Sequence, residues 1–559
     1  MQFDFPQSMK ATPLEDIDKS LKRLQYGKAA WSQVTAEKRL VLLKECMTDL
    51  SVVADEWIHT SCRGKGIQQD SSNAGEEWIG GFMPIMRNIR LLIHALKHQG
   101  QPPLPGVHQA NDQSIVKIFP MDLQEKLLFQ GFDAEVWIEP GKPASQGKIY
   151  RQPTETKVCL VLGAGNQGSI GPMDCLYKLF VENEICILKM NPVNDYLGPY
   201  VVRAFRALIE GNFLSVVYGG VEQGKYLCQH ELVDSIHITG SGRSHDAIVW
   251  GSDAAEQQKR KAANDPLCKK PITSELGCVS PILVVPGKWS AKEMDYQARQ
   301  IVSMVTHNAS YNCNAGKVLV MPKSWEKSEQ LMTKIQEHLR KKSGRTAFYP
   351  GSQERYQQFL DNYPDAIICG ERNEHVVPWT ILPNVPAQAD EYALNNEAFC
   401  GVLAVTYVNA NTADAYLTQA VSLCNDHLFG TLSCNMLIDP RTQKSSRSAF
   451  HQALRDLRYG SIAVNAWSGV NYGLCSASWG AYPGHTLQNI GSGIGIVHNT
   501  FMLDYPQKSI VKAPFVISPT PAWFYDNRNL IRLGQRLLKF EQNPSWLNFV
   551  TIAAQALRG

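Results

Sequence analysis

The sequence has 559 residues, with 55 Lys and Arg against 52 Asp and Glu, which gives a formal net charge of +3. A balance so close to neutral gives no electrostatic reason to expect a nucleic-acid partner. Hydrophobic residues make up 44% and charged residues 19%, the composition of an ordinary globular protein, so disorder is not expected. No apolar run approaches the ~20 residues that a membrane span needs, and the first residues lack a secretory signal, so we expect a cytoplasmic protein.

The first part of the chain reads as helical. Apolar residues recur at helical spacing over residues 13–50, and a second helical pattern covers residues 78–96. A proline-rich break at residues 102–105 follows. Residues 134–138 and 148–150 then read as two short strands joined by Pro140-Gly141-Lys142-Pro143, which predicts a β-hairpin arm.

Strands and helices alternate after this hairpin. The predicted strands are 158–162, 185–188, 215–218 and 235–238, with helices at 173–182 and 198–210. The second half repeats this texture, with strands at 282–285, 318–320, 403–405 and 461–464. Short apolar strands separated by helices predict parallel sheets covered by helices, and two such sheets imply a cleft between them.

The last predicted element is an amphipathic basic helix beyond Pro514. Leucines 530, 533 and 537 share one face, and arginines 528, 532 and 536 share another. Such a helix could lie on a membrane surface or bind a partner. We favour docking on the protein's own fold, because helices with one apolar face usually do so.

The 14 cysteines are scattered, with no C-x-x-C pair and no Cys and His cluster at metal-ligand spacing, so we predict no metal site. Cys313 differs from the others because polar or small residues surround it in the segment 308–317. Read together with Glu275 and Asn166, this thiol indicates covalent catalysis, in which a nucleophile needs a base and an oxyanion donor.

The glycine loop at residues 163–168 satisfies the dinucleotide fingerprint G-x-G-x-x-G, which is a weak signal alone. The fingerprint also requires an acidic residue about 20 positions on, and the second strand ends in Lys189 instead. Because the Asn166 amide stands at the strand-to-helix turn, we interpret the loop as catalytic first and phosphate-binding second.

These motifs together resemble the aldehyde dehydrogenase superfamily over residues 20–515. The family carries a loop asparagine, a lysine, a T-G-S turn, an E-L-G segment, a cysteine and an E-x-F segment in this order. The matching residues are Asn166, Lys189, Thr239-Gly240-Ser241, Glu275-Leu276-Gly277, Cys313 and Glu397-Ala398-Phe399.

The resemblance implies an α/β fold with a Rossmann-type cofactor domain, an α/β catalytic domain and a small β-hairpin oligomerisation arm. We expect residues 1–130 and 152–273 to form the NAD(P)-binding domain and residues 274–500 the catalytic domain. Residues 131–151 and 501–515 would form the arm, and residues 516–559 a C-terminal helical tail. A homodimer or homotetramer is expected from the resemblance alone.

The resemblance also implies oxidation of an aldehyde to a carboxylic acid with NAD or NADP. Cys313 would be the nucleophile, Asn166 and the backbone N–H of Cys313 the oxyanion donors, and Glu275 the base that activates water. The cofactor would be held by Lys189, Gly240 and Ser241 at its adenosine and pyrophosphate end and by Glu397 and Phe399 at its nicotinamide end.

This sequence departs from the family pattern at several positions. Pro192 stands where the family keeps an acidic residue, which leaves NAD and NADP both open, and Arg243 could meet a 2′-phosphate. The G-Q pair before the cysteine is Ser310-Tyr311, and Lys317 is the nearest cation to the family's arginine after the cysteine. Two alternatives therefore stay open: an acylating relative that uses coenzyme A or runs as an acyl reductase, and a catalytically inert cofactor-binding scaffold.

Overall fold

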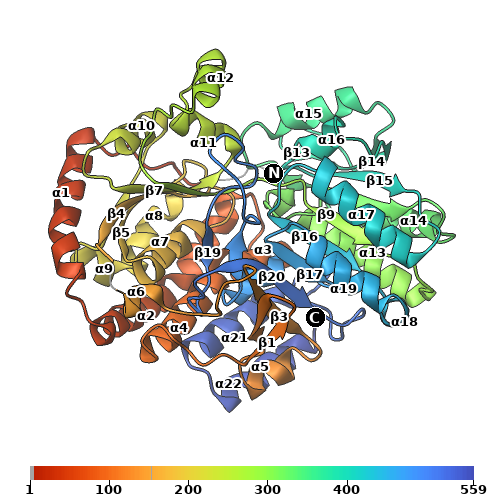
Figure 1. Cartoon of the computed structure of the whole chain (residues 1–559), viewed down its shortest axis with the longest axis horizontal. Helices are drawn as coiled ribbons and strands as arrows, with labels where there is room; N and C mark the ends of the chain where they lie inside the picture. Colours follow the sequence, from red (N-terminus) through yellow and green to blue (C-terminus); the bar gives the residue numbers. More distant parts are fainter. Residues whose placement is uncertain (1–4, 153) are drawn as a thin grey trace.

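The computed structural model describes residues 5–152 and 154–559; residues 1–4, which begin the predicted 1–130 segment, lie outside this range. Two sheets organise the chain, one of five strands and one of eleven. Figure 1 shows the smaller sheet with β4, β5 and β7 on one side of the molecule and the larger sheet with β9, β16 and β17 on the other. The predicted α/β class is confirmed.

The smaller sheet is entirely parallel, in the order β6-β5-β4-β7-β8. Its strands are β4 (Lys157–Leu162), β5 (Glu184–Lys189), β6 (Leu214–Val217), β7 (Ser235–Gly240) and β8 (Ile272–Leu276). Every residue of β5 is buried, which explains its near-continuous apolar sequence. The helices and turns of this half are α7 (Ile170–Val181), η2 (Asp195–Leu197), α8 (Gly198–Ala204), α9 (Arg206–Glu210), α10 (Val221–Gln229), α11 (Gly242–Val249) and α12 (Ala254–Ala263).

The N-terminal helices pack around this sheet in one hydrophobic core. They are α1 (Leu14–Trp31), α2 (Ala36–Gly64), α3 (Ser72–Glu76), the π-helix η1 (Glu77–Phe82) and α4 (Met83–Lys97). The predicted helical pattern over residues 13–50 is confirmed, but it divides into two helices.

The larger sheet has the order β1-β2-β3-β20-β17-β16-β9-β10-β15-β14-β12. Its strands from β20 to β14 are parallel, whereas β1, β2, β3 and β12 pair with their neighbours in antiparallel fashion. The strands are β1 (Gly106–Ala110), β2 (Gln113–Phe119), β3 (Asp133–Ile138), β9 (Pro281–Val284), β10 (Val318–Pro322), β12 (Ile367–Cys369), β14 (Trp379–Val385), β15 (Val402–Val408), β16 (Ser433–Leu437), β17 (Ser461–Val464) and β20 (Pro506–Lys512).

Helices and two short sheets surround these strands. The helices are α13 (Ala291–Thr306), α14 (Ser328–Lys341), α15 (Ser352–Asn362), α16 (Tyr392–Asn395), α17 (Ala413–His427), α18 (Pro440–Ser445), α19 (Arg447–Asp456) and α20 (Gly469–Leu474), with the 3-10 turn η3 (His307–Ser310). The short sheets pair β11 (Arg345–Thr346) with β13 (Val376–Val377) and β18 (Ser478–Gly480) with β19 (Ile496–His498).

The predicted hairpin is wrong in its second strand. Residues 148–150 belong to α6 (Lys148–Arg151), and β3 pairs instead with β2 and β20. The β20 strand then joins β17, so the predicted arm segments are continuous with the larger sheet. Whether this part mediates oligomerisation stays a prediction, as does the division into domains.

The C-terminal tail docks on the protein's own fold, as favoured from its sequence. The tail consists of α21 (Leu530–Gln542) and α22 (Trp546–Ala556), at the bottom of Figure 1. Its helix α22 contacts α5 (Leu123–Leu128). Glu541 of α21 forms buried ion pairs with Arg87 and Arg90 of α4, and Arg87 also pairs with Glu125. These pairs join the tail to the N-terminal helices.

Candidate active site

A cavity of about 1350 Å³ lies between the two sheets and is lined by all the predicted site residues. Such clefts beyond the carboxyl ends of parallel strands are where α/β proteins bind nucleotides and substrates. The residues from β4, β5 and β7 line one half, which we call the cofactor half because the sequence predicts cofactor binding there. The end of β8, the Cys313 segment and residues 395–397 and 399 line the other half, which we call the catalytic half after its predicted nucleophile and base.

Cys313 lies between η3 and β10, three residues beyond the left-handed stretch that ends at Ser310. The buried Lys317 ammonium donates to the carbonyl oxygen of Ser310 at 2.8 Å and to its hydroxyl oxygen at 3.1 Å. These two bonds tie residue 317, which follows Cys313, to residue 310, which precedes it. Cys313 itself is partly exposed to the cavity, unlike its buried neighbours.

Glu275 lies within hydrogen-bonding distance of the thiol. The Cys313 Sγ donates a hydrogen bond to Glu275 Oε1 at 3.1 Å. Burial and the adjacent Glu275 hold the pKa of Cys313 well above its usual range. Burial, with the Asp174 carboxylate nearby, raises the pKa of Glu275 to about 7. The thiol therefore needs a base to ionise it, and Glu275 is in place to accept that proton.

The Asn166 amide reaches the same point from the loop between β4 and α7. Its Nδ2 donates to the carbonyl oxygen of Tyr311 at 2.9 Å, and the residue is buried apart from the cavity that it lines. An amide fixed by one of its two N–H groups keeps the other for a ligand. The structure thus places Cys313, Glu275 and Asn166 around one cavity, and their catalytic roles stay a prediction.

Tyr311 does not line this cavity. Its ring is buried in an aromatic cluster with Phe348, Tyr349 and Phe399, at centroid distances of 4.8, 5.7 and 5.7 Å. The hydroxyl of Ser310 is occupied by Lys317. The Ser310-Tyr311 pair therefore packs on the side of the loop away from the cavity and leaves the thiol accessible. This accessibility weighs against a closed, inert site.

Glu397, which lines the catalytic half of the cavity, and the buried Lys317 lie close enough for each charge to affect the pKa of the other. Burial raises the pKa of Glu397 and lowers that of Lys317, and each charge partly offsets the effect on the other. Glu397 Oε1 is buried and has no hydrogen-bond partner among the described residues. The side chain of Phe399 lines the cavity beside it. This acceptor without a donor fits a ligand hydroxyl, such as one on a ribose.

The cofactor half contains a lysine side chain and the backbone N–H groups of a helix N-terminus. Lys189 ends β5, is 8% exposed and makes one hydrogen bond within the described residues, to Met190 O at 3.5 Å. Burial lowers the pKa of its ammonium group. Gly240 and Ser241 precede α11, whose N-terminus faces the cavity, and Ser241 caps this helix through the N–H of Ser244. A helix N-terminus with free N–H groups suits a pyrophosphate.

Arg243 and Lys225 also line this half and are exposed. Neither has an ion-pair partner in the part of the chain that the structure describes. Among the residues that the structure describes, the only carboxylates that line the cavity are Glu275 and Glu397, and both belong to its catalytic half. Pro192 lines the cavity where a ribose-binding carboxylate was expected. The residues therefore fit a dinucleotide, and Arg243 and Lys225 place positive charge in the cofactor half.

Sequence reasoning gave no role to the side chains of several polar residues behind the site. Thr239 is the cross-strand neighbour of Glu275, and its hydroxyl donates to the buried Asp174 at 2.9 Å. Asn308 donates to the carbonyl oxygens of both Asn166 and Tyr311. These contacts join segments far apart in the chain, so no local spacing could indicate them.

Among residues 5–152 and 154–559, no group of three or more His, Cys, Asp or Glu could hold a metal ion. No helix in this described part is long and apolar enough to cross a membrane.

Comparison with known proteins identifies the family. The sequence model of the aldehyde dehydrogenase family matches residues 176–475, which is more than half of the chain. The chain belongs to this family. The matched range contains Glu275, Cys313 and Glu397.

Individual relatives are distant. N-succinylglutamate 5-semialdehyde dehydrogenase of Novosphingobium aromaticivorans is 26% identical over 182 residues, which are 32% of this chain and 35% of that protein. The match thus spans about a third of the length of that curated relative. Its activity on a named semialdehyde does not transfer across so short a match.

Solved structures share the fold at low identity. The aldehyde dehydrogenase KauB from Pseudomonas aeruginosa has a TM-score of 0.63 and 16% identity, over 90% of each chain. A mutant of aldehyde dehydrogenase C from Pseudomonas syringae, in complex with NAD+ and octanal, has a TM-score of 0.61 and 14% identity, over 91% of each chain. Glyceraldehyde-3-phosphate dehydrogenase GapN from Methanocaldococcus jannaschii, complexed with NADP, has a TM-score of 0.60 and 12% identity, over 90% of this chain and 95% of that one.

Proposed function

We propose that this protein oxidises an aldehyde to a carboxylic acid with NAD or NADP, through a thioester on Cys313. The observation that carries the proposal is the hydrogen bond of 3.1 Å from Cys313 Sγ to Glu275 Oε1, in the cavity that Asn166 also lines. A nucleophile, a base and an oxyanion donor at one point define acyl-transfer chemistry.

The first step is attack on the aldehyde. The thiol proton passes to Glu275, and the Cys313 sulfur forms a bond to the carbonyl carbon. The carbonyl oxygen becomes an oxyanion, which accepts hydrogen bonds from the free N–H of Asn166 and from the backbone N–H of Cys313. Preorganised donors of this kind stabilise the transition state because they need no reorientation as charge develops.

The second step is oxidation and release. A nicotinamide held beside Glu397 and Phe399 would supply the hydride acceptor that oxidation of the hemiacetal carbon to a thioester requires. Glu275, having released its proton to solvent, takes a proton from water, and the resulting hydroxide attacks the thioester. The bond between carbon and sulfur breaks, the carboxylic acid leaves and Cys313 is restored. With a pKa of about 7, Glu275 can accept and release protons near neutral pH.

The cofactor would be held by Lys189 at its adenosine ribose, by Gly240 and Ser241 at its pyrophosphate, and by Glu397 and Phe399 at its nicotinamide end. The solved relatives in complex with NAD+ and with NADP support either cofactor. We propose that NADP is accepted here, because Arg243 and Lys225 are free to meet a 2′-phosphate and Pro192 offers no carboxylate to repel it.

Hydrolysis is favoured over transfer to coenzyme A because Glu275 lies within reach of the thioester sulfur and is positioned to activate water. A panel of short, long and aromatic aldehydes with NAD+ or NADP+ tests the proposal through formation of reduced nicotinamide. We expect turnover without coenzyme A and release of the free acid. No turnover on any aldehyde with either cofactor would contradict the proposal, and strong stimulation by coenzyme A would favour the acylating alternative.

A further inference from the structure

The backbone that leads to the nucleophile is held in an uncommon conformation. Asn308, Ala309 and Ser310 have φ angles of 53°, 55° and 69°, all in the left-handed region. Residues other than glycine rarely adopt this conformation, and consecutive ones persist only where surrounding contacts impose it. The contacts that impose it here converge on Asn308, which is completely buried.

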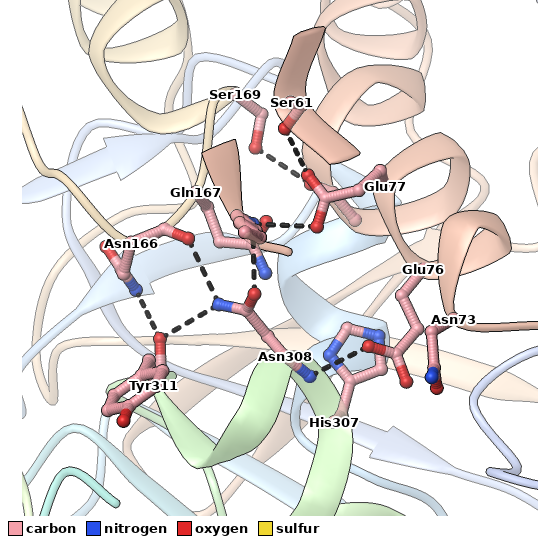
Figure 2. A network of polar contacts seen from close by, with 12 residues as sticks. Ser61, Asn73, Glu76, Glu77, Asn166, Gln167, Ser169, His307, Asn308 and Tyr311 are labelled. Atoms are coloured by element: carbon pink, nitrogen blue, oxygen red, sulfur yellow. Dashed lines mark hydrogen bonds and ion pairs between the residues drawn. The ribbon is translucent and has the colours of Figure 1, made fainter. Parts of the chain in front are cut away.

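Asn308 joins the two loops that carry the catalytic groups. Its Nδ2 donates to the carbonyl oxygen of Asn166 at 3.0 Å and to that of Tyr311 at 3.1 Å, with Asn312 Oδ1 a further acceptor at 3.2 Å. Its backbone N–H donates to Glu76 Oε2 at 3.0 Å. Figure 2 shows Asn308 between these groups, with Asn166 and Tyr311 on one side and Glu76 on the other.

The orientation of the Asn308 amide is fixed by a buried charge pair from the N-terminal helices. Lys65 Nζ donates to Asn308 Oδ1 at 2.9 Å and pairs with Glu77 Oε1 at 2.7 Å, while Ser61 donates to Glu77 Oε2 at 2.5 Å. A flipped amide would present its NH₂ to the ammonium and its oxygen to two carbonyl oxygens, so only one orientation is compatible with these partners.

The carbonyl oxygen of Tyr311 connects Asn308 to Asn166, the proposed oxyanion donor. It accepts hydrogen bonds from Asn308 Nδ2 and from Asn166 Nδ2, at 3.1 and 2.9 Å. Because Asn308 also holds the backbone of Asn166, one amide fixes both the donor and the acceptor of the bond that orients the Asn166 side chain. That bond decides where the second N–H of Asn166 points.

We propose that Asn308 is the positioning residue of the oxyanion donor, and that Lys65 and Glu77 set its amide orientation. The inference rests on the proposed role of Cys313 as nucleophile. Asn308 touches no reacting atom and acts through Asn166. The thiol is held separately, by Glu275 and by the Lys317 contacts to Ser310. Loss of the Asn308 amide therefore disturbs stabilisation of the oxyanion more than reactivity of the sulfur.

Two reagents that both modify Cys313 separate these effects. With p-nitrophenyl acetate, the sulfur bonds to the ester carbon, a tetrahedral oxyanion forms, and p-nitrophenolate leaves. With iodoacetamide, the sulfur displaces iodide in one step and no oxyanion develops. Both reactions give the thiol proton to Glu275, so the ratio of their rate constants reports on oxyanion stabilisation alone.

The test variant is Asn308→Gly, which keeps the left-handed backbone accessible while removing the amide. We expect ester acylation to slow by about 10²-fold, since misplacing a catalytic group by about 1 Å costs that much, while alkylation changes by less than about twofold. Asn308→Asp, which keeps the shape but replaces the donor with an acceptor, should give the same split. The double variant K65M/E77Q, which removes the charge pair without leaving one charge unpaired, should give a smaller split in the same direction.

The matched control is R87M/E541Q, which removes one partner of each sign from the buried ion pairs of the tail and should leave the ratio unchanged. The rate constant for the ester is measured from the absorbance burst of p-nitrophenolate and from intact mass, and that for iodoacetamide from the intact mass of the labelled protein. Equal rates in wild type and in both Asn308 variants, an equal loss of both reactions, or a split in the control would overturn the inference. A wild-type protein in which neither reagent labels Cys313 would instead contradict the proposed function.

Discussion

The two halves of the cavity differ in how complete they are. In the catalytic half the Cys313 thiol and the Asn166 amide already have protein partners, at 3.1 and 2.9 Å. In the cofactor half Lys189 has one bond of 3.5 Å within the described residues, and Arg243 and Lys225 have no ion pair there.

This difference in hydrogen-bond partners matches the different needs of catalytic groups and of ligand-binding groups. A catalytic group must be held in its reactive geometry before substrate arrives, because reorientation during the reaction adds to the barrier. A binding group does the opposite: it keeps hydrogen-bonding capacity free for the ligand that completes the site. We therefore expect changes in the catalytic half to lower kcat and changes in the cofactor half to weaken cofactor binding.

The largest expected effect comes from the nucleophile. Cys313→Ser should lower kcat on the order of 10⁴-fold or more, because a serine hydroxyl is a far weaker nucleophile and no covalent thioester forms. Aldehyde turnover and the dissociation constant of the cofactor are the two measurements. The cofactor should still bind with wild-type affinity, and a variant that kept its turnover would exclude Cys313 as nucleophile.

The base should have the next largest effect. Glu275→Gln should lower kcat by about 10²- to 10⁴-fold, the usual contribution of a general base. Because the pKa of Glu275 is raised to about 7, its basic form dominates only above that pH. Wild-type kcat/KM should therefore rise about tenfold per pH unit below pH 7 and level off above it. The variant should lack this rise; a profile that kept it would assign the titration to another group.

The oxyanion donor should follow. Asn166→Ala should lower kcat by about 10²- to 10³-fold, since this is the usual cost of removing one such donor. Asn166→Asp is a useful companion because its carboxylate would repel the oxyanion instead of binding it. Both should leave cofactor affinity unchanged, as measured by equilibrium titration. A rise in KM at constant kcat would indicate that Asn166 binds substrate and does not stabilise the transition state.

Much of the fold followed from local patterns. Strands such as β4 and β5 are short apolar runs between helices, and parallel sheets leave that signature because both of their faces are buried. The second hairpin strand failed at residues 148–150, where the chain forms α6 instead. The first predicted strand, β3, pairs instead with β2 and β20, and its pairing with the distant β20 depends on contacts that no local pattern contains.

The residues of the candidate site also divide into those that a local sequence pattern indicates and those that it does not. Cys313, Glu275 and Asn166 each sit in a small polar segment whose composition has a local signature, and their order matched a known family. Lys65 and Glu77 have no such signature, because their role depends on how two N-terminal segments meet the loop at residue 308 in the fold. The residues proposed to touch reactants therefore have a signature in the sequence, whereas the residues proposed to orient them became visible only in the fold.

The smallest expected effect concerns the choice between cofactors. The double variant K225A/R243A should weaken binding of NADP by about tenfold, within the range for hydrogen bonds to a charged group at an exposed site, and leave binding of NAD unchanged. Salt should reduce the difference, because exposed charges are screened. Lys259→Ala, an exposed cation of α12 outside the cavity, is the matched control. Equal loss of affinity for both dinucleotides would move these two cations from the 2′-phosphate to the pyrophosphate that NAD and NADP share.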